Sequence, residues 1–409
     1  MKIGIYGGTF NPIHRGHLTA ARAVKDALGL DKLLLMVDGI PPHKQLPEGS
    51  ADNDDRFAMA ELATAELGKW AEASDIELRR QGKSYTSDTL RELKTQYPDD
   101  ELWLIMGSDM FLSLHTWHEP EVIMSLAGIA ASSRLEENED AAFAAQKKLL
   151  EALYGARIVT FCNPNVIEIS STEVREALKR GEGQQYLTDA VYGYIARRHL
   201  YGTKVDCKNL TIDELRPIAM SYLKPKRMPH VLGTEQEAIR LAKQYGADVH
   251  KAQVAALLHD CTKKLNMDEQ LALCAHYGIE LDELEKKALK LLHAKTGAAV
   301  ARDVFGVDDE IYNAIYWHTT GKADMTVLEK VIYMADYIEP NRMFDGVEDL
   351  RDAVHTDLDM GLLMGLEDCI AEMVERGNPA ISRTSPSATR TSASASARST
   401  RRPVPATRA

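Results

Sequence analysis

The sequence predicts a chain with two folded parts, an α/β part built on a parallel sheet and an all-α helical bundle. Short apolar runs alternate with amphipathic helical stretches over the first two hundred residues, whereas the pattern is helical from Thr211 to about Arg376. The composition then changes abruptly at Ala380 to Ser, Ala, Thr, Arg and Pro. A chain of 409 residues is long enough for each part to bury its own core.

The elements of the first part follow one another in regular order. Residues 2–6 form an apolar run that ends at Gly7 and Gly8, as expected for a buried strand entering a turn. We expect a helix over 16–29, a strand over 32–37, a polar loop over 38–53 and a helix through Trp70. Further strands are expected at 101–106, 128–131 and 157–161. This alternation predicts βαβ units, in which ligands bind outside the carboxyl ends of the strands.

The second part has a clear beginning and end in the sequence. Thr211 to Glu214 forms a T-x-x-E capping box, which predicts the start of a helix. We therefore expect one domain over residues 1–203 and an all-α domain over residues 207–379. Residues 380–409 are expected to be a disordered low-complexity tail, because they contain six arginines and no acidic residue.

Composition excludes several classes of protein. The net charge of -12 argues against a partner such as nucleic acid, which requires a basic surface. The five cysteines form no C-x-x-C pair, so neither a disulfide framework nor a thiolate zinc site is indicated. The N-terminus does not resemble a signal peptide, and no apolar run is long enough to span a membrane. These features favour a cytoplasmic protein. The sequence does not indicate its oligomeric state.

The turn after the first strand has the features of a phosphate cradle. Gly8, Thr9 and Phe10 begin the turn, and His14 and His17 lie at the start of the following helix. Glycine lets the backbone approach a ligand closely, and a helix N-terminus offers unpaired N–H groups to an anion. Two imidazoles three residues apart face the same side and can donate hydrogen bonds to phosphoryl oxygens. Such a turn is a weak signal alone, and paired histidines also occur by chance.

Two signatures give this part a family resemblance. GGTFNPIHRGHL at 7–18 resembles the first motif of the nucleotidyltransferases with an HxGH motif, and ISSTEVR at 169–175 resembles their ISSTxIR motif, with Val174 for the usual Ile. SYTSDTL at 84–90 and HTW at 115–117 resemble the bacterial nicotinate-nucleotide adenylyltransferases. The resemblance implies a Rossmann-like fold and transfer of AMP from ATP to nicotinate mononucleotide, which yields nicotinate adenine dinucleotide and pyrophosphate in NAD biosynthesis.

The resemblance also implies roles for individual residues. It makes His14, His17 and Arg175 catalytic, with Mg²⁺ arriving on ATP, and Tyr85, Thr86 and Trp117 the residues that bind the pyridine substrate. The residues implied to bind ATP are Gly8, Thr9, Phe10, Lys44, Gly107, Asp109, Ser170, Ser171 and Thr172.

The residues themselves leave other interpretations open. Ser170 and Ser171 are both expected as helix N-caps, and Asp109 could cap a helix in the same way. Core packing is the alternative for Trp117. We expect no capping role for His17.

Histidines and aspartates in the helical part are spaced symmetrically. The midpoint between His230 and His259 falls beside Gly246, and that between His293 and His318 falls beside Gly306. Residues equidistant from the turn of an antiparallel hairpin lie side by side, so each pair should meet across a hairpin. With Asp260 and Asp336, the histidines form a set that suits two ions of iron, manganese or zinc.

This part resembles the HD hydrolase superfamily. LLHDCTK at 257–263, WHTTG at 317–321 and ADYIEPNR at 335–342 are most similar to the bacterial symmetrical diadenosine-tetraphosphate hydrolases, which yield two ADP. The resemblance implies that all six residues bind metal, with iron favoured over Mn²⁺ and with Asp260 bridging the ions. It also implies phosphate contacts from Arg227, Lys263 and Arg342.

Two alternatives stay open at this point. The HD domain could be a non-catalytic module that senses nucleotides, in which case no redox metal is required. The first domain could adenylylate another acceptor, such as a phosphopantetheine, although the SYTSDTL and HTW segments argue against it.

Overall fold

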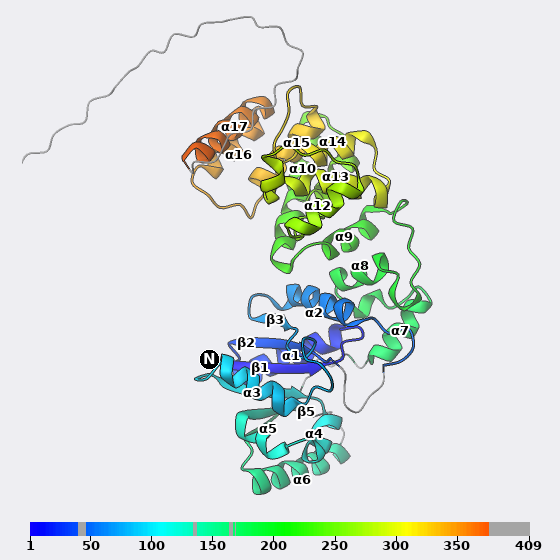
Figure 1. Cartoon of the computed structure of the whole chain (residues 1–409), viewed down its shortest axis with the longest axis vertical. Coiled ribbons are helices and arrows are strands. Elements are labelled where there is room, and N and C mark those ends of the chain that lie inside the picture. Colours follow the sequence, from blue (N-terminus) through cyan, green and yellow to red (C-terminus); the bar gives the residue numbers. More distant parts are fainter. Residues whose placement is uncertain (40–45, 134–136, 163–166, 168, 376–409) are drawn as a thin grey trace, which may run out of the picture.

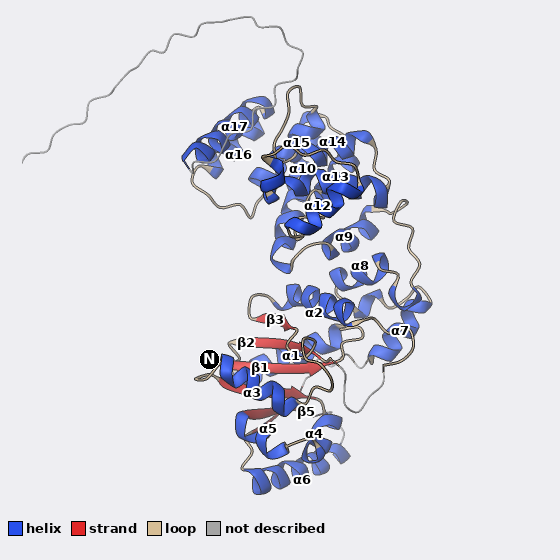
Figure 2. Cartoon of the chain, in the orientation of Figure 1, coloured by secondary structure: helices blue, strands red, loops and turns tan. Residues whose placement is uncertain are grey.

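The computed structural model describes residues 1–39, 46–133, 137–162, 167 and 169–375 (Figure 1). The expectations for Lys44 and for the tail at 380–409 lie outside these residues. All strands of the described chain lie in the N-terminal half, and the C-terminal half is helical (Figure 2). Among the described residues, no helix combines the length and the apolarity that crossing a membrane requires.

The N-terminal half contains a six-stranded sheet in which every neighbouring pair is parallel. The order is β3-β2-β1-β4-β5-β6, so the chain crosses to the other side of β1 after β3. The predicted α/β fold is thereby confirmed. The strands are β1 (Lys2–Gly8), β2 (Lys32–Val37), β3 (Ala71–Ser74), β4 (Glu101–Met106), β5 (Ala127–Ser133) and β6 (Ile158–Cys162).

Strand β3 was not predicted, and the expected helix through Trp70 ends earlier, at Leu67. The four residues of β3 are half-buried or exposed and include Glu72, so they show no apolar run. They form an edge strand that pairs with β2 alone. This strand exists because it pairs with β2. The pattern of apolar residues in the sequence carries no information about such pairing.

Helices cover both faces of the sheet because alternate side chains of each strand point to opposite faces. In β2, Leu33 and Leu35 belong to one buried cluster with α1 and α2, whereas Leu34 and Met36 belong to another with α3 and α5. The helices of this half are α1 (Arg15–Leu28), α2 (Asn53–Leu67), α3 (Thr86–Gln96), α4 (Ser108–Ser113), α5 (Pro120–Leu126), α6 (Glu137–Tyr154), α7 (Ser171–Lys179) and α8 (Asp189–Arg197).

The helical half begins at the predicted capping box. The side chain of Thr211 accepts a hydrogen bond from the N–H of Glu214, and the Glu214 carboxylate accepts one from the N–H of Thr211. The helices are α9 (Ile212–Ser221), α10 (Met228–Tyr245), α11 (Val249–Leu258), α12 (Met267–His276), α13 (Leu289–Phe305), α14 (Asp309–Trp317), α15 (Val327–Ile338), α16 (Val347–Thr356) and α17 (Leu358–Glu375). Short 3₁₀ helices occur at η1 (Leu114–Thr116), η2 (Gln184–Tyr186), η3 (Leu200–Gly202), η4 (Pro225–Arg227) and η5 (Glu285–Lys287).

The glycine turns predicted between the histidine-bearing helices are present. Gly246 ends α10 with a φ of +75°, and Gly306 ends α13 with a φ of +66°. Both values lie in the left-handed region that glycine adopts without steric cost. Each turn lets the next helix fold back antiparallel, which brings together residues far apart in sequence.

The two halves pack against each other through α8 and α9. A Cβ atom at Gly193 of α8 would lie 2.0 Å from the main-chain oxygen of Pro217 in α9, so only glycine permits this approach. Arg197 adds a hydrogen bond of 2.9 Å from its Nε to Oγ of Ser221. Helices α2, α8 and α9 therefore form a stack between the sheet and the other helices (Figure 1).

Candidate active sites

The predicted phosphate cradle lies at the carboxyl edge of the sheet. Strand β1 ends at Gly8, and its neighbour β4 ends at Met106, directly before Gly107 and Asp109. Since the chain leaves β1 and β4 for opposite halves of the sheet, the two strand ends bound the position where ligands of open parallel sheets bind. Asp109 is in the first turn of α4, whose N-cap is Gly107, so Asp109 does not cap that helix.

His14 and His17 lie against each other at the start of α1. Their ring centroids are 3.8 Å apart, and Nδ1 of His17 accepts a hydrogen bond of 3.2 Å from the N–H of His14. The expectation that His17 caps nothing is therefore wrong, because its ring caps the first turn. In the neutral ring this contact leaves the proton on Nε2.

Burial keeps both imidazoles neutral. Desolvation lowers the pKa of His14 to about 4. It also lowers the pKa of His17 well below its ordinary value, and repulsion between two imidazolium charges this close would act in the same direction. His17 is thus a neutral ring with an Nε2–H donor at physiological pH.

The second signature brings α7 onto the cradle. Ser170 is the N-cap of α7, as predicted, and its hydroxyl accepts the N–H of Glu173. Ser171 is not a cap: it is the first residue of the helix, and its hydroxyl donates to the main-chain oxygen of Pro12 at 3.0 Å. Arg175 donates to the oxygen of Asn11 at 2.7 Å and to Oγ1 of Thr172 at 3.0 Å. The N-terminus of α7 is thereby fixed to the cradle loop.

The predicted acceptor residues lie around α3 and α5. Thr86 begins α3, and the ring of Tyr85 is tilted against that of His118 with centroids 4.3 Å apart. Trp117 is partly buried against the core, and its Nε1–H points to Oγ of Ser113 at 3.4 Å. Core packing and ligand contact both fit this half-buried indole. His118, which directly follows the HTW segment, was not among the predicted residues.

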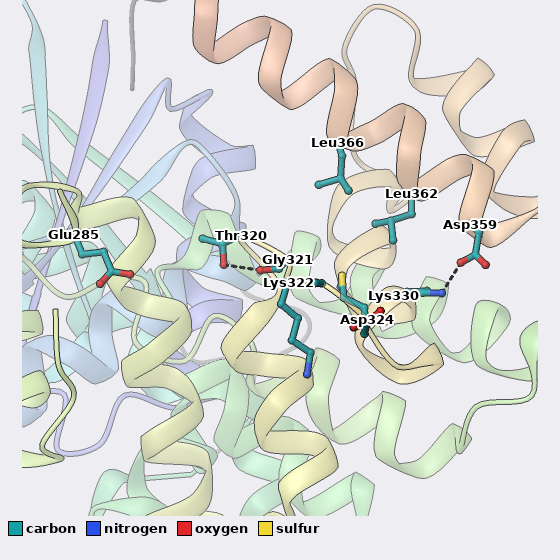
Figure 3. A pocket seen from close by; sticks show the side chains of 11 residues that line it. Glu285, Thr320, Gly321, Lys322, Asp324, Lys330, Asp359, Leu362 and Leu366 are labelled. Carbon is teal, nitrogen blue, oxygen red and sulfur yellow. Dashed lines mark hydrogen bonds and ion pairs between the residues drawn. The ribbon is translucent and has the colours of Figure 1, made fainter. Parts of the chain in front are cut away.

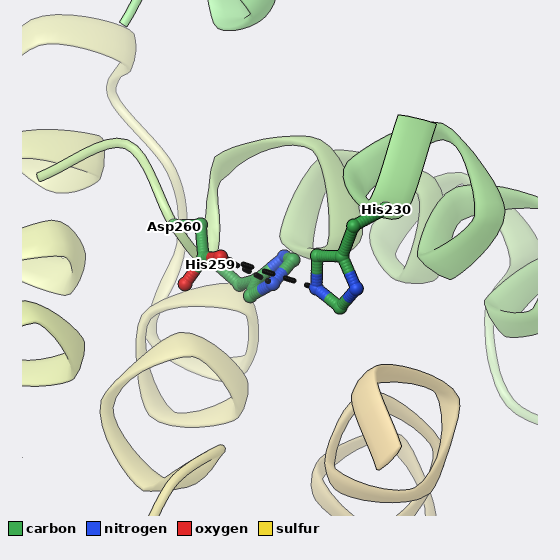
Figure 4. Close-up of side chains that lie close together, drawn as sticks. All are labelled: His230, His259 and Asp260. Carbon is green, nitrogen blue, oxygen red and sulfur yellow. Dashed lines mark ion pairs between the residues drawn. The ribbon is translucent and has the colours of Figure 1, made fainter. Parts of the chain in front are cut away.

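Five helices bring the predicted metal ligands together. His230 lies on α10, His259 and Asp260 at the end of α11, His293 on α13, His318 at the end of α14, and Asp336 on α15. The histidine pairs meet across their hairpins as predicted: the ring centroids of His230 and His259 are 5.6 Å apart, and those of His293 and His318 are 5.0 Å apart. Figure 4 shows His230, His259 and Asp260 pointing toward one another.

The carboxylate of Asp260 lies between the two histidine pairs. Its Oδ1 is 3.2 Å from Nε2 of His293 and 3.9 Å from Nε2 of His318. Its Oδ2 is 3.5 Å from Nε2 of His259 and 3.9 Å from Nε2 of His230. The two oxygens therefore face different pairs, an orientation suited to bridging two ions.

Main-chain and carboxylate partners aim the imidazoles inward. Nδ1 of His259 lies 2.6 Å from the oxygen of Ala256, and Nδ1 of His318 lies 2.6 Å from the oxygen of Ile315. Their Nε2 atoms therefore point into the cluster. Nε2 of His259 and Oδ1 of Asp260 are buried without a hydrogen-bond partner among the described residues. Unpartnered buried donor atoms of this kind are what a divalent ion requires, so the residues fit a metal centre.

The charges within the cluster favour ionised aspartates. Burial alone would raise the pKa of Asp260, but the charge of His259 and the close approach of His293 and Lys263 hold that pKa well below its usual value. Burial would likewise raise the pKa of Asp336, but the hydrogen bond from His230 together with the charges of His259 and His318 holds that pKa well below its usual value. Burial lowers the pKa of His318 well below its usual value.

Glu339 is a site residue that sequence reasoning missed. Its buried carboxylate lies 3.1 Å from Nδ1 of His230, and it accepts the side-chain N–H of Asn341 at 3.0 Å. Gly233 makes room for it, because a Cβ atom there would lie 2.2 Å from Oε2 of Glu339. A carboxylate on the far nitrogen of a metal-binding histidine fixes the ring and raises its basicity.

The three predicted phosphate contacts surround the same cluster. Nε of Arg227 is 2.5 Å from Oδ2 of Asp260. Nζ of Lys263 is 3.0 Å from Nε2 of His293. Arg342 donates to Oδ1 of Asp336 at 2.8 Å. Each of the three cations therefore contacts a predicted metal ligand directly.

A cavity of about 430 Å³ lies elsewhere in the helical half (Figure 3). The loop after α14 forms one wall, and Leu362 and Leu366 of α17 form another. The lysines in its lining are paired, Lys322 with Glu329 and Lys330 with Asp359. None of the predicted site residues lines this cavity.

Comparison with known proteins assigns the first half to a family. Residues 5–177 match the cytidylyltransferase-like family model. The chain is 39% identical over 216 residues to the probable nicotinate-nucleotide adenylyltransferase of Geobacter metallireducens, covering 98% of that protein and 49% of this chain. The corresponding protein of a Shewanella species is 39% identical over 218 residues, with 99% and 49% covered. The chain belongs to this adenylyltransferase family through its N-terminal half.

The second half of the chain matches a different family. Residues 227–341 match the HD domain model, a range that contains all six predicted metal ligands. Among solved structures, the chain is similar to a predicted HD superfamily hydrolase involved in NAD metabolism from Clostridium acetobutylicum. The identity is 40%, with 41% of this chain and 90% of that one covered and a TM-score of 0.40. The match to the HD domain model alone shows that this adenylyltransferase family member also carries an HD domain.

Proposed function

We propose that residues 1–203 transfer AMP from ATP to nicotinate mononucleotide. The observation that carries the proposal is the neutral His14–His17 pair at the cradle, in a chain of the nicotinate-nucleotide adenylyltransferase family. The phosphate of the acceptor attacks the α-phosphorus of ATP in line, and pyrophosphate leaves. Nε2–H of His17 donates to the α-phosphoryl oxygen as negative charge develops there.

The remaining residues of this site position ATP and the acceptor. The N-termini of α1 and α7 present unpaired N–H groups to phosphate, and Arg175 adds its charge beside the cradle loop. Mg²⁺ would enter with ATP and, when bound, would supply positive charge to the phosphates. Tyr85, Thr86 and Trp117 would bind the pyridine ring, with main-chain amides near Thr86 meeting its carboxylate.

Acceptor competition tests this proposal. We expect kcat/KM to be higher for nicotinate mononucleotide than for nicotinamide mononucleotide, because only the former has the carboxylate. Equal values or a nicotinamide preference would remove the specificity claim. Turnover of phosphopantetheine in place of either nucleotide would replace the assigned reaction by another of the same fold.

We further propose that residues 207–379 form a phosphohydrolase that cleaves diadenosine tetraphosphate to two ADP. The supporting observation is that the two oxygens of Asp260 face separate histidine pairs. His230, His259, His293, His318, Asp260 and Asp336 would hold two ions, iron or manganese. When bound, such ions supply Lewis acidity and lower the pKa of water. Arg227, Lys263 and Arg342 would bind the phosphates, and Glu339 would orient His230.

Metal and product analyses distinguish hydrolysis from nucleotide sensing. The purified full chain is expected to retain about two ions per molecule and to give ADP alone from diadenosine tetraphosphate. ATP with AMP would mean a different position of attack. Metal-loaded protein that binds the tetraphosphate without cleaving it would favour the sensing alternative.

A further inference from the structure

Arg56 of α2 is a fully buried arginine with no role in the functions above. Its side chain is 0% exposed. Its Nη1 donates to the main-chain oxygen of Thr9 at 2.9 Å, and its Nη2 donates to Oδ1 of Asn53 at 2.7 Å and to the main-chain oxygen of Gly39 at 3.4 Å. Burying a guanidinium is costly even when it is hydrogen-bonded. The contacts of Arg56 therefore show which parts of the chain its guanidinium holds together.

The first contact reaches the donor side of the proposed transferase site. Thr9 lies in the cradle loop after β1, two residues before Asn11, whose main-chain oxygen binds Arg175. The same loop is tied to the end of β2, because the N–H of Asp38 donates to the oxygen of Gly8 at 3.1 Å. The charge of Asp38 favours the ionised guanidinium, whereas burial lowers the pKa of Arg56.

The second contact reaches toward the acceptor side. Gly39 packs on the main chain of Glu77, where an added Cβ would lie 2.7 Å from the Glu77 oxygen. That oxygen also lies 3.4 Å from Oγ of Ser84, the residue before Tyr85. The carboxylate of Glu77 accepts a hydrogen bond of 2.8 Å from Oγ1 of Thr89 in α3. A short chain of contacts thus runs from Arg56 to the segment proposed to bind the pyridine nucleotide.

We propose that Arg56 is a positioning residue that sets the spacing between the ATP cradle and the acceptor segment. The inference rests on the proposed transferase function of this site. The planar guanidinium is suited to the task, since its fork of donors holds two loops at once in fixed geometry, which a lysine ammonium does less rigidly. Arg56 itself touches neither substrate and acts through Thr9 and Gly39.

Two substitutions and one control test the kinetic consequence. Arg56→Met should lower kcat about a hundredfold, the cost of misplacing reacting groups by about 1 Å, while KM for ATP changes less than about threefold. Arg56→Lys should recover at least about tenfold of that loss, because the ammonium still reaches one carbonyl oxygen. Arg22→Met is the matched control: Arg22 also donates to a main-chain oxygen, that of Glu66 at 2.7 Å, but at the surface. Its kcat should equal that of the unmodified chain.

Hydrogen exchange of the full chain separates positioning from simple stability. Amides at 7–11 and 37–39 should exchange at least about tenfold faster in Arg56→Met than in Arg22→Met, with helices α10 to α15 unchanged. Unaltered exchange of these segments, or a normal kcat for the folded Arg56→Met protein, would overturn the positioning role. Should Arg56→Met not fold, Arg56→Lys provides the same two readouts. An unmodified chain without adenylyl transfer would instead overturn the proposed function, and the exchange result would still decide whether Arg56 couples the two loops.

Discussion

The two nitrogens of the His17 imidazole differ, because the fold uses Nδ1 and the proposed function uses Nε2. Nδ1 accepts the N–H of His14, so the ring is oriented before any ligand arrives, and only Nε2–H remains to meet a phosphoryl oxygen. A donor fixed in advance stabilises developing charge without reorganising at the moment of reaction.

His17→Ala should therefore lower kcat of adenylyl transfer by at least about a hundredfold, the scale of losing one such donor. Because the ring also caps α1, the free energy of unfolding should fall by about 1 kcal/mol, which leaves the protein folded. Steady-state kinetics and thermal unfolding of the same preparation measure both effects. A near-normal kcat with only a raised KM would mean that His17 merely binds ATP.

The buried histidine pair also predicts the pH dependence of transfer. Burial lowers the pKa of His14 from 6.5 to about 4 and lowers the pKa of His17 well below 6.5, so both rings are expected to be neutral near pH 7. We expect kcat/KM to show no loss attributable to these residues between pH 8 and pH 6. Their contribution to stability is present above the unfolded pKa of 6.5 and is lost as the pH falls toward 4. An activity decline centred near pH 6.5 that disappears in His14→Ala would contradict the neutral assignment.

In the second site, Glu339 gives a prediction about metal affinity. Glu339→Ala removes the carboxylate on Nδ1 of His230 without removing a proposed ligand. Loss of such a partner typically weakens metal binding about tenfold to a hundredfold. Metal retained after equilibrium with graded chelator measures the effect, and Glu348→Ala on α16 is a control at an exposed carboxylate. Equal retention by both variants would show that Glu339 only packs the core.

At the scale of elements, the sequence was most informative where a turn determines geometry. Gly246 and Gly306 adopt positive φ, so each helix folds back and the paired histidines meet as their spacing predicts. Strands with continuous apolar runs, such as β2 and β4, could also be predicted from the sequence, because buried parallel strands require such runs.

Other features had no local signal. Strand β3 lacks an apolar run, and its existence depends on pairing with β2. Arg56 looks in the sequence like an ordinary polar residue of a helix, and Glu339, although it lies in the ADYIEPNR segment, has no spacing that links it to His230. Their partners lie 109 residues away for Glu339 and 47 residues away for Arg56 at Thr9, so only the tertiary fold identifies them.

The joint between α8 and α9 carries a prediction at the same scale. Gly193→Ala places a Cβ atom where the main-chain oxygen of Pro217 is 2.0 Å away, so one helix must move. We expect a loss of at least about 2 kcal/mol in the free energy of unfolding, as for overpacking of a tight core. Denaturant titration measures it. An unchanged midpoint would mean that the two helices separate without cost.

At the scale of the whole molecule, the two proposed active sites lie in separate halves of the chain. The proposed transferase residues lie at the carboxyl edge of the sheet, and the proposed metal ligands lie inside the helical half, with α2, α8 and α9 stacked between the sheet and that half. No described residue is shared by the two predicted sets. Independence in chemistry is therefore expected even though the halves pack tightly.

Asp260→Asn tests this independence at the residue on which the helical site depends most. The amide keeps the shape of the side chain but removes the charge that faces both histidine pairs, so metal content should fall to near zero and hydrolysis of diadenosine tetraphosphate should be abolished. Adenylyl transfer should stay within about twofold of the unmodified chain. Asp268→Asn, which changes an exposed aspartate on α12, is the matched control and should change neither reaction.

Loss of both reactions in Asp260→Asn, with an unchanged unfolding midpoint, would show that the two sites are coupled through the stacked helices. Retention of metal and hydrolysis would remove Asp260 from the site.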